Sequence, residues 1–336
     1  MLSQRWRTAL ATALCAAGCA QPILAQGVAP TILQIDVENF VRYVEDTTDP
    51  SRFATNPGIT PAAVPRNFGE FIAFADIVAV NGQPTKGTYI SRGRLINLSP
   101  APTAGSAIAD TTRTGAVDTR FEILNLDGTP VGTVVAVEVG GGPPPPGAPL
   151  AITQGNNAIV GGTGAYLGVR GSFGQAVTSQ SVATRMASMA EDPGNRRKNG
   201  GGRTRFVLQV IPMTRPEILV TAGVPVIAHA NSNEIVTASN PAAAGETLIA
   251  FATGLGPTVP GVDPGQPFPS SPPAVVNSQV QVTVNGRPTD ATRAVGVPGL
   301  VDTYAVTFRA PSDTGDATVY VTAAWVGGPK VTFPVR

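Results

Sequence analysis

Side chains able to perform nucleophilic or acid–base chemistry are scarce in this sequence. Its 336 residues include one histidine, His229, and two cysteines, Cys15 and Cys19. A Cys/His zinc site takes four ligands, so this inventory excludes one, and we expect neither a metal nor a cofactor. A Ser-His-Asp triad would have to use His229, which lies in a proline-flanked stretch that we interpret as a connector. We therefore expect no catalytic histidine.

An arginine and an aspartate are the strongest candidates for binding a ligand. Arg170 follows a glycine-rich segment, and its guanidinium could bind a carbonyl, phenol or carboxylate oxygen. Strand alternation groups Arg170 with Gly168 and Ser172, which leaves an inward and an outward orientation open. Asp76 interrupts a very apolar run, where its carboxylate either faces solvent or is held in a cavity with a raised pKa.

Two phenols and a basic stretch are further candidates. Tyr89 and Tyr166 lie on expected segments of the barrel and could donate a hydrogen bond inside a pocket, although tyrosines more often pack with the hydroxyl at a rim. The basic residues between 196 and 205 could contact an anionic surface of the cell envelope. A solvated, mobile loop over residues 178–203 is the alternative interpretation.

The elements that must position these residues are strands. Glycine (38 residues) and proline (32) are abundant, which is typical of short strands joined by many turns. Alternating apolar residues predict seven strands with hairpin connections within residues 67–213. They are expected at residues 71–80, 87–98, 116–126, 131–139, 152–160, 168–177 and 204–211. Periodicity alone leaves a closed barrel and a sandwich open.

The N-terminal segment is typical of a targeting signal. Arg5 and Arg7 precede an apolar, alanine-rich run, so we expect residues 1–25 to be a signal peptide cleaved after Ala25. Lipidation at Cys19 is the alternative. Either route exports the protein, which would then be periplasmic, associated with the outer membrane or extracellular.

The segments that flank the first strand series have different patterns. Residues 26–66 are expected to be a lead-in containing a short amphipathic helix over Ile35–Asp46. A proline-rich linker is expected at 214–232, followed at 233–336 by a second strand series that suits an immunoglobulin-sized β-sandwich. The helix is predicted from the spacing of Val37, Phe40, Val41 and Val44.

The charge balance excludes one class of partner. Charged residues make up 13% of the chain and the net charge is +1, so composition gives no support for nucleic-acid binding.

The segment Asn157–Gln175 resembles the signature of dirigent proteins, in which a strand runs into GGTG, then an aromatic residue, then Arg-Gly. The resemblance implies an all-β fold with an eight-stranded antiparallel barrel of the allene oxide cyclase and dirigent kind, a central cavity and a homotrimer. It also implies that the arginine lies in the barrel lining and positions a phenolic ligand, with an acid, here Asp76, on the first strand. The matching residues are the turn Gly161, Gly162, Thr163 and Gly164, then Tyr166 and Arg170-Gly171.

The C-terminal part resembles the immunoglobulin-like end domain of many secreted bacterial proteins. The resemblance implies export and a β-sandwich, and it says little about chemistry. The matching pieces are Gly245-Glu246-Thr247, Gly254-Leu255-Gly256-Pro257, Pro267, Pro298-Gly299 and Tyr304 with Pro311.

Two functions follow as hypotheses. In the first, an exported barrel binds a small apolar or phenolic molecule, and any reaction is a cofactor-independent cyclisation or coupling steered by shape. In the second, a cell-envelope interaction protein performs no ligand chemistry, and its sandwich domain acts in adhesion. A partly apolar cavity on which Arg170 and an acid converge would favour the first, and a filled interior would favour the second.

Overall fold

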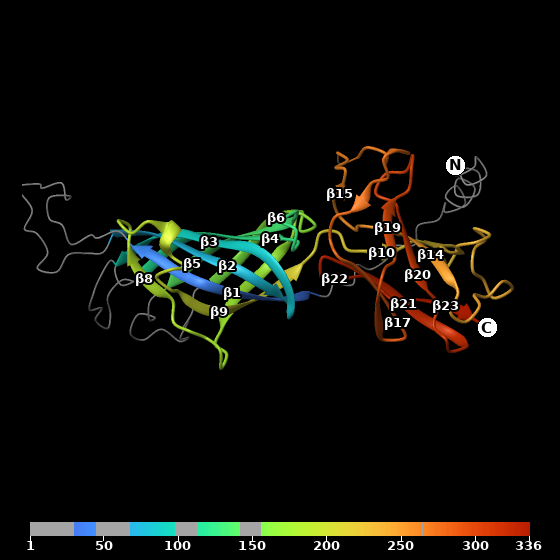
Figure 1. Cartoon of the computed structure of the whole chain (residues 1–336), viewed down its shortest axis with the longest axis horizontal. Coiled ribbons are helices and arrows are strands. Elements are labelled where there is room, and N and C mark those ends of the chain that lie inside the picture. Colours follow the sequence, from blue (N-terminus) through green and yellow to red (C-terminus); the bar gives the residue numbers. More distant parts are fainter. Residues whose placement is uncertain (1–29, 45–67, 98–112, 142–155, 264) are drawn as a thin grey trace, which may run out of the picture. The chain divides into compact units, whose positions relative to one another are not determined.

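The chain divides into two compact units, each described here by itself. The computed structural model describes residues 30–44, 68–97, 113–141, 156–263 and 265–336. The barrel unit covers Pro30–Met213, and the described part of the second unit covers Thr214–Arg336 (Figure 1). The predicted signal peptide, with Cys19 and Ala25, lies outside the described residues. In the ranges given above, no helix has the length and apolar character needed to cross a membrane.

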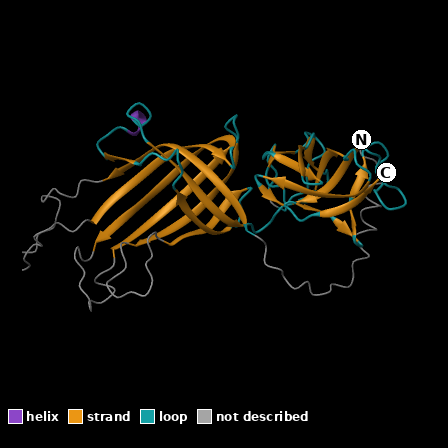
Figure 2. Cartoon of the chain, turned by 90° about the horizontal axis from the view of Figure 1, so that it is seen from below, coloured by secondary structure: helices purple, strands orange, loops and turns teal. Residues whose placement is uncertain are grey.

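The first unit is a closed antiparallel barrel of eight strands, which confirms the predicted all-β class. Its strands pair in the order β1-β2-β3-β4-β5-β6-β7-β9, and β9 pairs back with β1. Figure 2 shows the strands of this unit wrapped into a barrel. Closure leaves no free barrel edge for another chain to extend. The strands are β1 Thr31–Val44, β2 Phe68–Val80, β3 Gln83–Asn97, β4 Arg113–Leu124, β5 Pro130–Gly141, β6 Asn156–Gly164, β7 Arg170–Ala176 and β9 Gly202–Ile211.

The segment predicted as a helix forms β1, a barrel strand in addition to the seven that were predicted. The helix over Ile35–Asp46 is therefore wrong, and the barrel begins at Thr31 rather than at residue 67. The error has a physical cause in a β-bulge at Asn39, which has φ 53° and where the pairing of β1 with both neighbours shifts register. Because a bulge adds one residue to one strand, Val37 and Phe40 are both buried three residues apart, the spacing of a helical turn.

The connection between β7 and β9 is folded against the barrel. It contains β8 (Arg185–Ser188), which pairs in parallel with the last four residues of β1, and a short 3-10 helix at Pro193–Asn195. Arg185 donates two hydrogen bonds to Glu191, at 2.8 and 2.7 Å, and one to the carbonyl of Gly200 at 2.7 Å. The predicted mobile loop is therefore wrong, and we call residues 177–201 the outer strap.

Glycines are required at two positions of the GGTG segment because the backbone of a neighbouring segment lies against them. A Cβ on Gly162 would lie 2.3 Å from the carbonyl oxygen of Tyr166. Gly164 has φ +60°, and a Cβ there would lie 2.6 Å from the carbonyl oxygen of Val131. Gly161 differs, since the nearest atom to its Cβ would be a terminal nitrogen of Arg170 at 3.7 Å.

We expect Gly162→Ala to destabilise the barrel by about 1–3 kcal/mol, since a methyl group there forces the backbone to move. Gly161→Ala is the matched control and should change the free energy of unfolding by less than about 0.5 kcal/mol. Denaturant unfolding of both variants checks this. Equal destabilisation by the two substitutions would contradict the close backbone contact assigned to Gly162 and not to Gly161.

The second unit contains further antiparallel sheets, and it begins earlier than expected. The residues predicted as a linker, 214–232, contain short strands that pair within this unit, so that prediction is wrong.

One sheet of the second unit runs β10-β14-β20-β19-β16-β15, with β13 also paired to β14, and another runs β18-β17-β21, with β22 and β23 paired to β21. The early strands are β10 Glu217–Ile218, β11 Val220–Thr221, β12 Val224–Pro225 and β13 Ile227–His229. The first large sheet adds β14 Thr247–Thr253, β15 Thr258–Val259, β16 Val275–Val276, β19 Arg293–Gly296 and β20 Tyr304–Arg309. The other contains β17 Val280–Val284, β18 Arg287–Asp290, β21 Gly315–Ala323, β22 Val326–Gly327 and β23 Val331–Val335.

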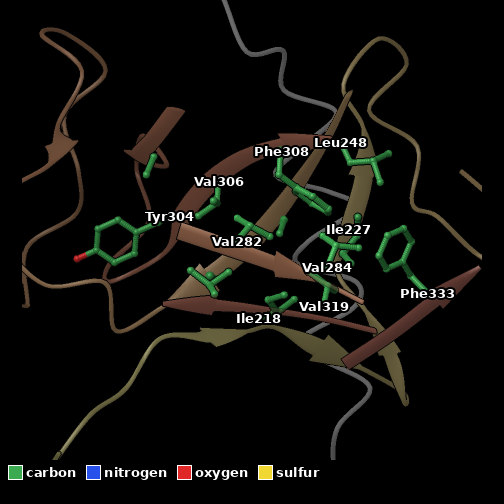
Figure 3. Packing of buried hydrophobic residues seen from close by; sticks show 14 of the residues in the cluster. Ile218, Ile227, Leu248, Val282, Val284, Tyr304, Val306, Phe308, Val319 and Phe333 are labelled. Carbon is green, nitrogen blue, oxygen red and sulfur yellow. The ribbon is translucent and has the colours of Figure 1, made fainter. Parts of the chain in front are cut away.

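The two larger sheets of this unit share one hydrophobic core. Leu248 and Phe308 from one sheet lie in the same buried cluster as Val282, Val319 and Phe333 from the other (Figure 3). Alternate residues along each strand supply this face, and the second strand series predicted within 233–336 is confirmed by strands such as β14, β17 and β23.

Candidate functional site

The barrel interior holds a cluster of five aromatic rings. The rings of Tyr89 and Phe206 are stacked, with centroids 4.7 Å apart. Phe40 and Phe121 each contact both of these rings, and Phe173 packs on Phe121 and Phe206. All five are at most 8% exposed, so side chains fill this level of the barrel.

A polar cluster lies beside the rings, toward the end of the barrel where β1 and β5 terminate. It consists of Arg42, Tyr89, Ser91, Thr119 and Glu138, which we call the inner polar cluster. Ser91 and Thr119 are paired across β3 and β4 and are almost fully buried. The hydroxyl of Thr119 donates a hydrogen bond to the carboxyl of Glu138.

Arg42 brings a cation into this interior. It pairs in register with Ala73, which is buried in the barrel, and its guanidinium carbon lies 3.6 Å from the centroid of the Phe71 ring. Burial lowers the pKa of Arg42, and Tyr89 and Glu138 act in the opposite direction. Its Nε is buried, and no acceptor lies within hydrogen-bond distance of it in the described part of the chain. Leaving a charged donor without an acceptor costs folding free energy.

The acidic and phenolic members of the cluster have raised pKa values. Burial raises the pKa of Glu138, although the hydrogen bond from Thr119 and the charge of Arg42 partly oppose this. Burial also raises the pKa of Tyr89, and the nearby Glu138 adds to the effect. The interior thus presents a phenol, a carboxyl group with a raised pKa and a cation with a free donor.

We expect Glu138→Gln to change how stability depends on pH. A carboxyl whose folded pKa is raised stabilises the fold below its unfolded pKa of about 4.3, and that contribution is lost as the pH rises through the folded value. Relative to Glu138→Gln, the natural chain should therefore be most stable at low pH and lose stability as the pH increases. Urea unfolding between pH 4 and 8 measures this difference, and a difference that does not vary with pH would contradict a buried, perturbed Glu138.

The structure places Arg170 on the outer face of the barrel. Of the two orientations that the sequence left open, it has the outward one. Arg170 is exposed, and its Nη1 donates to the backbone carbonyls of Val160 and Val169, while its neighbour Phe173 points into the ring cluster. The lining position that the resemblance implies for this arginine is therefore not found, and Arg170 does not converge with an acid on the barrel interior.

Asp76 also lies on the outside of the barrel. It neither faces open solvent nor lies in a cavity with a raised pKa, the two environments that the sequence left open. Burial acts to raise its pKa, but hydrogen bonds from Arg197 and Asn39 and the charge of Arg196 outweigh this, so the pKa lies below its usual value. Arg197 donates to both carboxylate oxygens, at 2.8 and 2.7 Å, and Arg196 forms a second ion pair. Two residues of the expected basic stretch, Arg196 and Arg197, thus bind Asp76.

The remaining candidates lie apart from one another. Tyr89 belongs to the inner polar cluster, whereas Tyr166 is buried at the opposite end of the barrel, in the turn between β6 and β7. His229 lies in β13 of the second unit, where its Nδ1 is 2.7 Å from a carboxylate oxygen of Glu246. No group of three or more His, Cys, Asp or Glu residues suited to a metal ion occurs in the described ranges.

Sequence reasoning missed Arg42 and Glu138 for identifiable reasons. Arg42 was assigned to a helix, because the bulge at Asn39 conceals the strand alternation. Glu138 shares a strand face with Val134 and Ala136, and a charged residue on an apolar face is a usable signal. Both faces of that strand are apolar in the sequence, however, so alternation alone did not show which face is inside.

No family model matches this chain, and no curated protein matches it.

Proposed function

We propose that the barrel unit binds a small apolar or phenolic molecule that carries an oxygen acceptor, with Arg42 as the group that anchors it. The observation that carries the proposal is the buried Nε of Arg42, which has no acceptor among the described residues. A bound oxygen would satisfy this donor in a low-dielectric interior, where a charge-assisted hydrogen bond is strong. Glu138 and Tyr89 would contact the same polar group, and the ring cluster would contact the apolar body.

The family resemblance gives this proposal its wider content. We propose that the protein belongs with barrels of the allene oxide cyclase and dirigent kind, is exported, and has an immunoglobulin-like second unit. Any reaction would be a cofactor-independent cyclisation or coupling, in which the barrel holds a reactive molecule in one geometry. A homotrimer and contact with the envelope surface are parts of the same proposal.

A second function is favoured by a specific observation. The ring cluster fills one level of the barrel, and the outer strap exposes four large apolar side chains, Val177, Val182, Met186 and Met189. A cell-envelope interaction protein without ligand chemistry would have a filled barrel and an adhesive outer surface. It would bind no small molecule inside, and this separates the two functions.

Native mass spectrometry of the full chain tests the proposal. The protein is recovered from the exported fraction and then incubated with three probes: 4-hydroxycinnamic acid, 4-hydroxycinnamyl alcohol and octanoic acid. We expect one small molecule per barrel, either retained from the cell or taken from the probes, and the same spectrum reports the number of subunits. A chain that retains nothing and takes up none of the probes would favour the interaction protein instead.

A further inference from the structure

The bulge in β1 determines which side chains of this strand enter the barrel. Before the bulge, Ile35 and Val37 face inward, in register with Phe206 and Thr204 of β9. After it, the inward residues are Phe40, which joins the ring cluster, and Arg42. Without the extra residue, strict two-residue alternation would continue through Asn39 and would place Arg42 on the outer wall.

The bulge is held from outside by a chain of polar contacts. Asn39 adopts φ 53°, a conformation that asparagine tolerates better than most residues. Its side-chain amide donates a hydrogen bond of 2.9 Å to Asp76 on β2. Asp76 in turn accepts hydrogen bonds from Arg196 and Arg197 of the outer strap, so four residues from three segments meet at this point.

The strap also packs directly on the bulge. A Cβ at Gly201 would lie 2.5 Å from the carbonyl carbon of Asn39, so the two backbones are in close contact there. Beyond the bulge, β8 pairs with Val41–Val44. The strap therefore fixes β1 from the bulge to its end, the stretch that contains Arg42.

We propose that Asn39, Asp76, Arg196 and Arg197 are positioning residues that act from the outer wall to keep Arg42 inside the barrel. The inference rests on the proposed function for its biological meaning, because Arg42 matters to a ligand only if one binds there. The placement of Arg42 itself can be tested without any ligand. Burial raises the pKa of Glu138 and the charge of Arg42 opposes that rise, so the titration of this carboxyl group reports whether the guanidinium is nearby.

The test compares four variants of the full chain. Asp76→Asn removes the charge that binds the strap, and Asn39→Val disfavours the positive φ of the bulge, since β-branched residues avoid it. Asn39→Gly is the conservative variant, because glycine adopts this φ freely. Glu38→Gln is the matched control: Glu38 lies on the same outer wall and pairs with Arg203 at 2.9 Å, but it does not belong to the chain that holds Asn39.

The readout is the pH titration of the Glu138 carboxyl carbon by NMR, without ligand. We expect its midpoint to move upward by about one pH unit in Asp76→Asn and Asn39→Val, because the favourable charge of Arg42 is withdrawn. Asn39→Gly should restore most of the natural midpoint, and Glu38→Gln should leave it unchanged. An unaltered midpoint in folded Asp76→Asn and Asn39→Val would overturn the proposal. If Asn39→Val fails to fold, the double variant Arg196→Met, Arg197→Met replaces it. This variant removes the strap residues that bind Asp76, and the same upward shift of the Glu138 midpoint is expected.

Binding of 4-hydroxycinnamic acid to the same variants separates this inference from the proposed function. If the Glu138 midpoint moves and the affinity for 4-hydroxycinnamic acid falls toward that of Arg42→Met, the positioning role and the proposed function are both supported. A moved midpoint in a chain that binds none of the three probes supports the positioning role and contradicts the proposed function. Probe binding that Arg42→Met weakens and Asp76→Asn leaves intact supports the proposed function and overturns the positioning role.

Discussion

Arg42→Met is expected to weaken binding of an oxygen-bearing ligand by roughly 10- to 100-fold. Hydrogen bonds that involve a charged group contribute about 1.5–3 kcal/mol, and methionine keeps an unbranched apolar stem while removing every donor. The same substitution should leave the stability of the free protein equal or higher, because a half-buried charged side chain whose buried Nε has no acceptor is replaced by an apolar group. Calorimetric titration with the three probes and urea unfolding measure the two effects.

Arg92→Met is the matched control for this prediction. Arg92 lies on the outer face of β3, is mostly exposed and pairs loosely with Asp118 at 3.7 Å. Its removal should change neither probe affinity nor stability by a measurable amount, since exposed ion pairs contribute little. If Arg42→Met bound the probes as tightly as Arg92→Met did, Arg42 would not be the anchoring group.

Phe206→Ala is expected to produce the largest loss of stability, about 3–5 kcal/mol. Phe206 contacts four other rings of the cluster and is 4% exposed, so its truncation removes a large buried area and leaves a cavity that its neighbours cannot fill. Because stabilities of single domains are typically 5–15 kcal/mol, the barrel would become marginal. Denaturant unfolding followed by tyrosine fluorescence would register the change.

Leu167→Ala provides the comparison for that loss. Leu167 is 59% exposed, and truncation of an exposed side chain is expected to change stability by less than about 0.5 kcal/mol. A small effect of Phe206→Ala, close to that of Leu167→Ala, would mean that the ring cluster does not form the centre of the barrel core.

The strands could be predicted from the sequence wherever one face of the barrel or of a sheet is plainly apolar. The alternation in β4, with Phe121 and Ile123 inward and Arg120 outward, is of this kind. Closure of the barrel could not be deduced from periodicity, because its first strand contains the bulge at Asn39 and resembles a helix in its spacing. The resemblance of Asn157–Gln175 to dirigent proteins was needed to favour an eight-stranded barrel.

The candidate site was harder to predict than the fold. Arg170 was singled out by its motif, yet its side chain lies outside and bonds to backbone carbonyls. Asp76 was correctly noticed as a charge in an apolar strand, but its partners Arg196 and Arg197 are about 120 residues away in the sequence. Contacts of that kind depend on how the strap folds back, which no local pattern encodes. Tyr89 was the one candidate placed beside Arg42 and Glu138.

The arginine Nε–H signals of the protein in an ¹H–¹⁵N NMR spectrum test the central claim most directly. The Arg42 signal is assigned as the one absent from Arg42→Met, and the three probes are then added in turn. A ligand seated on the inner polar cluster should shift this signal strongly and saturably, while the signals of exposed arginines such as Arg92 and Arg170 stay in place. If a probe binds and shifts only outer-wall signals, or if none of the three moves the Arg42 signal, the barrel interior is not the binding site.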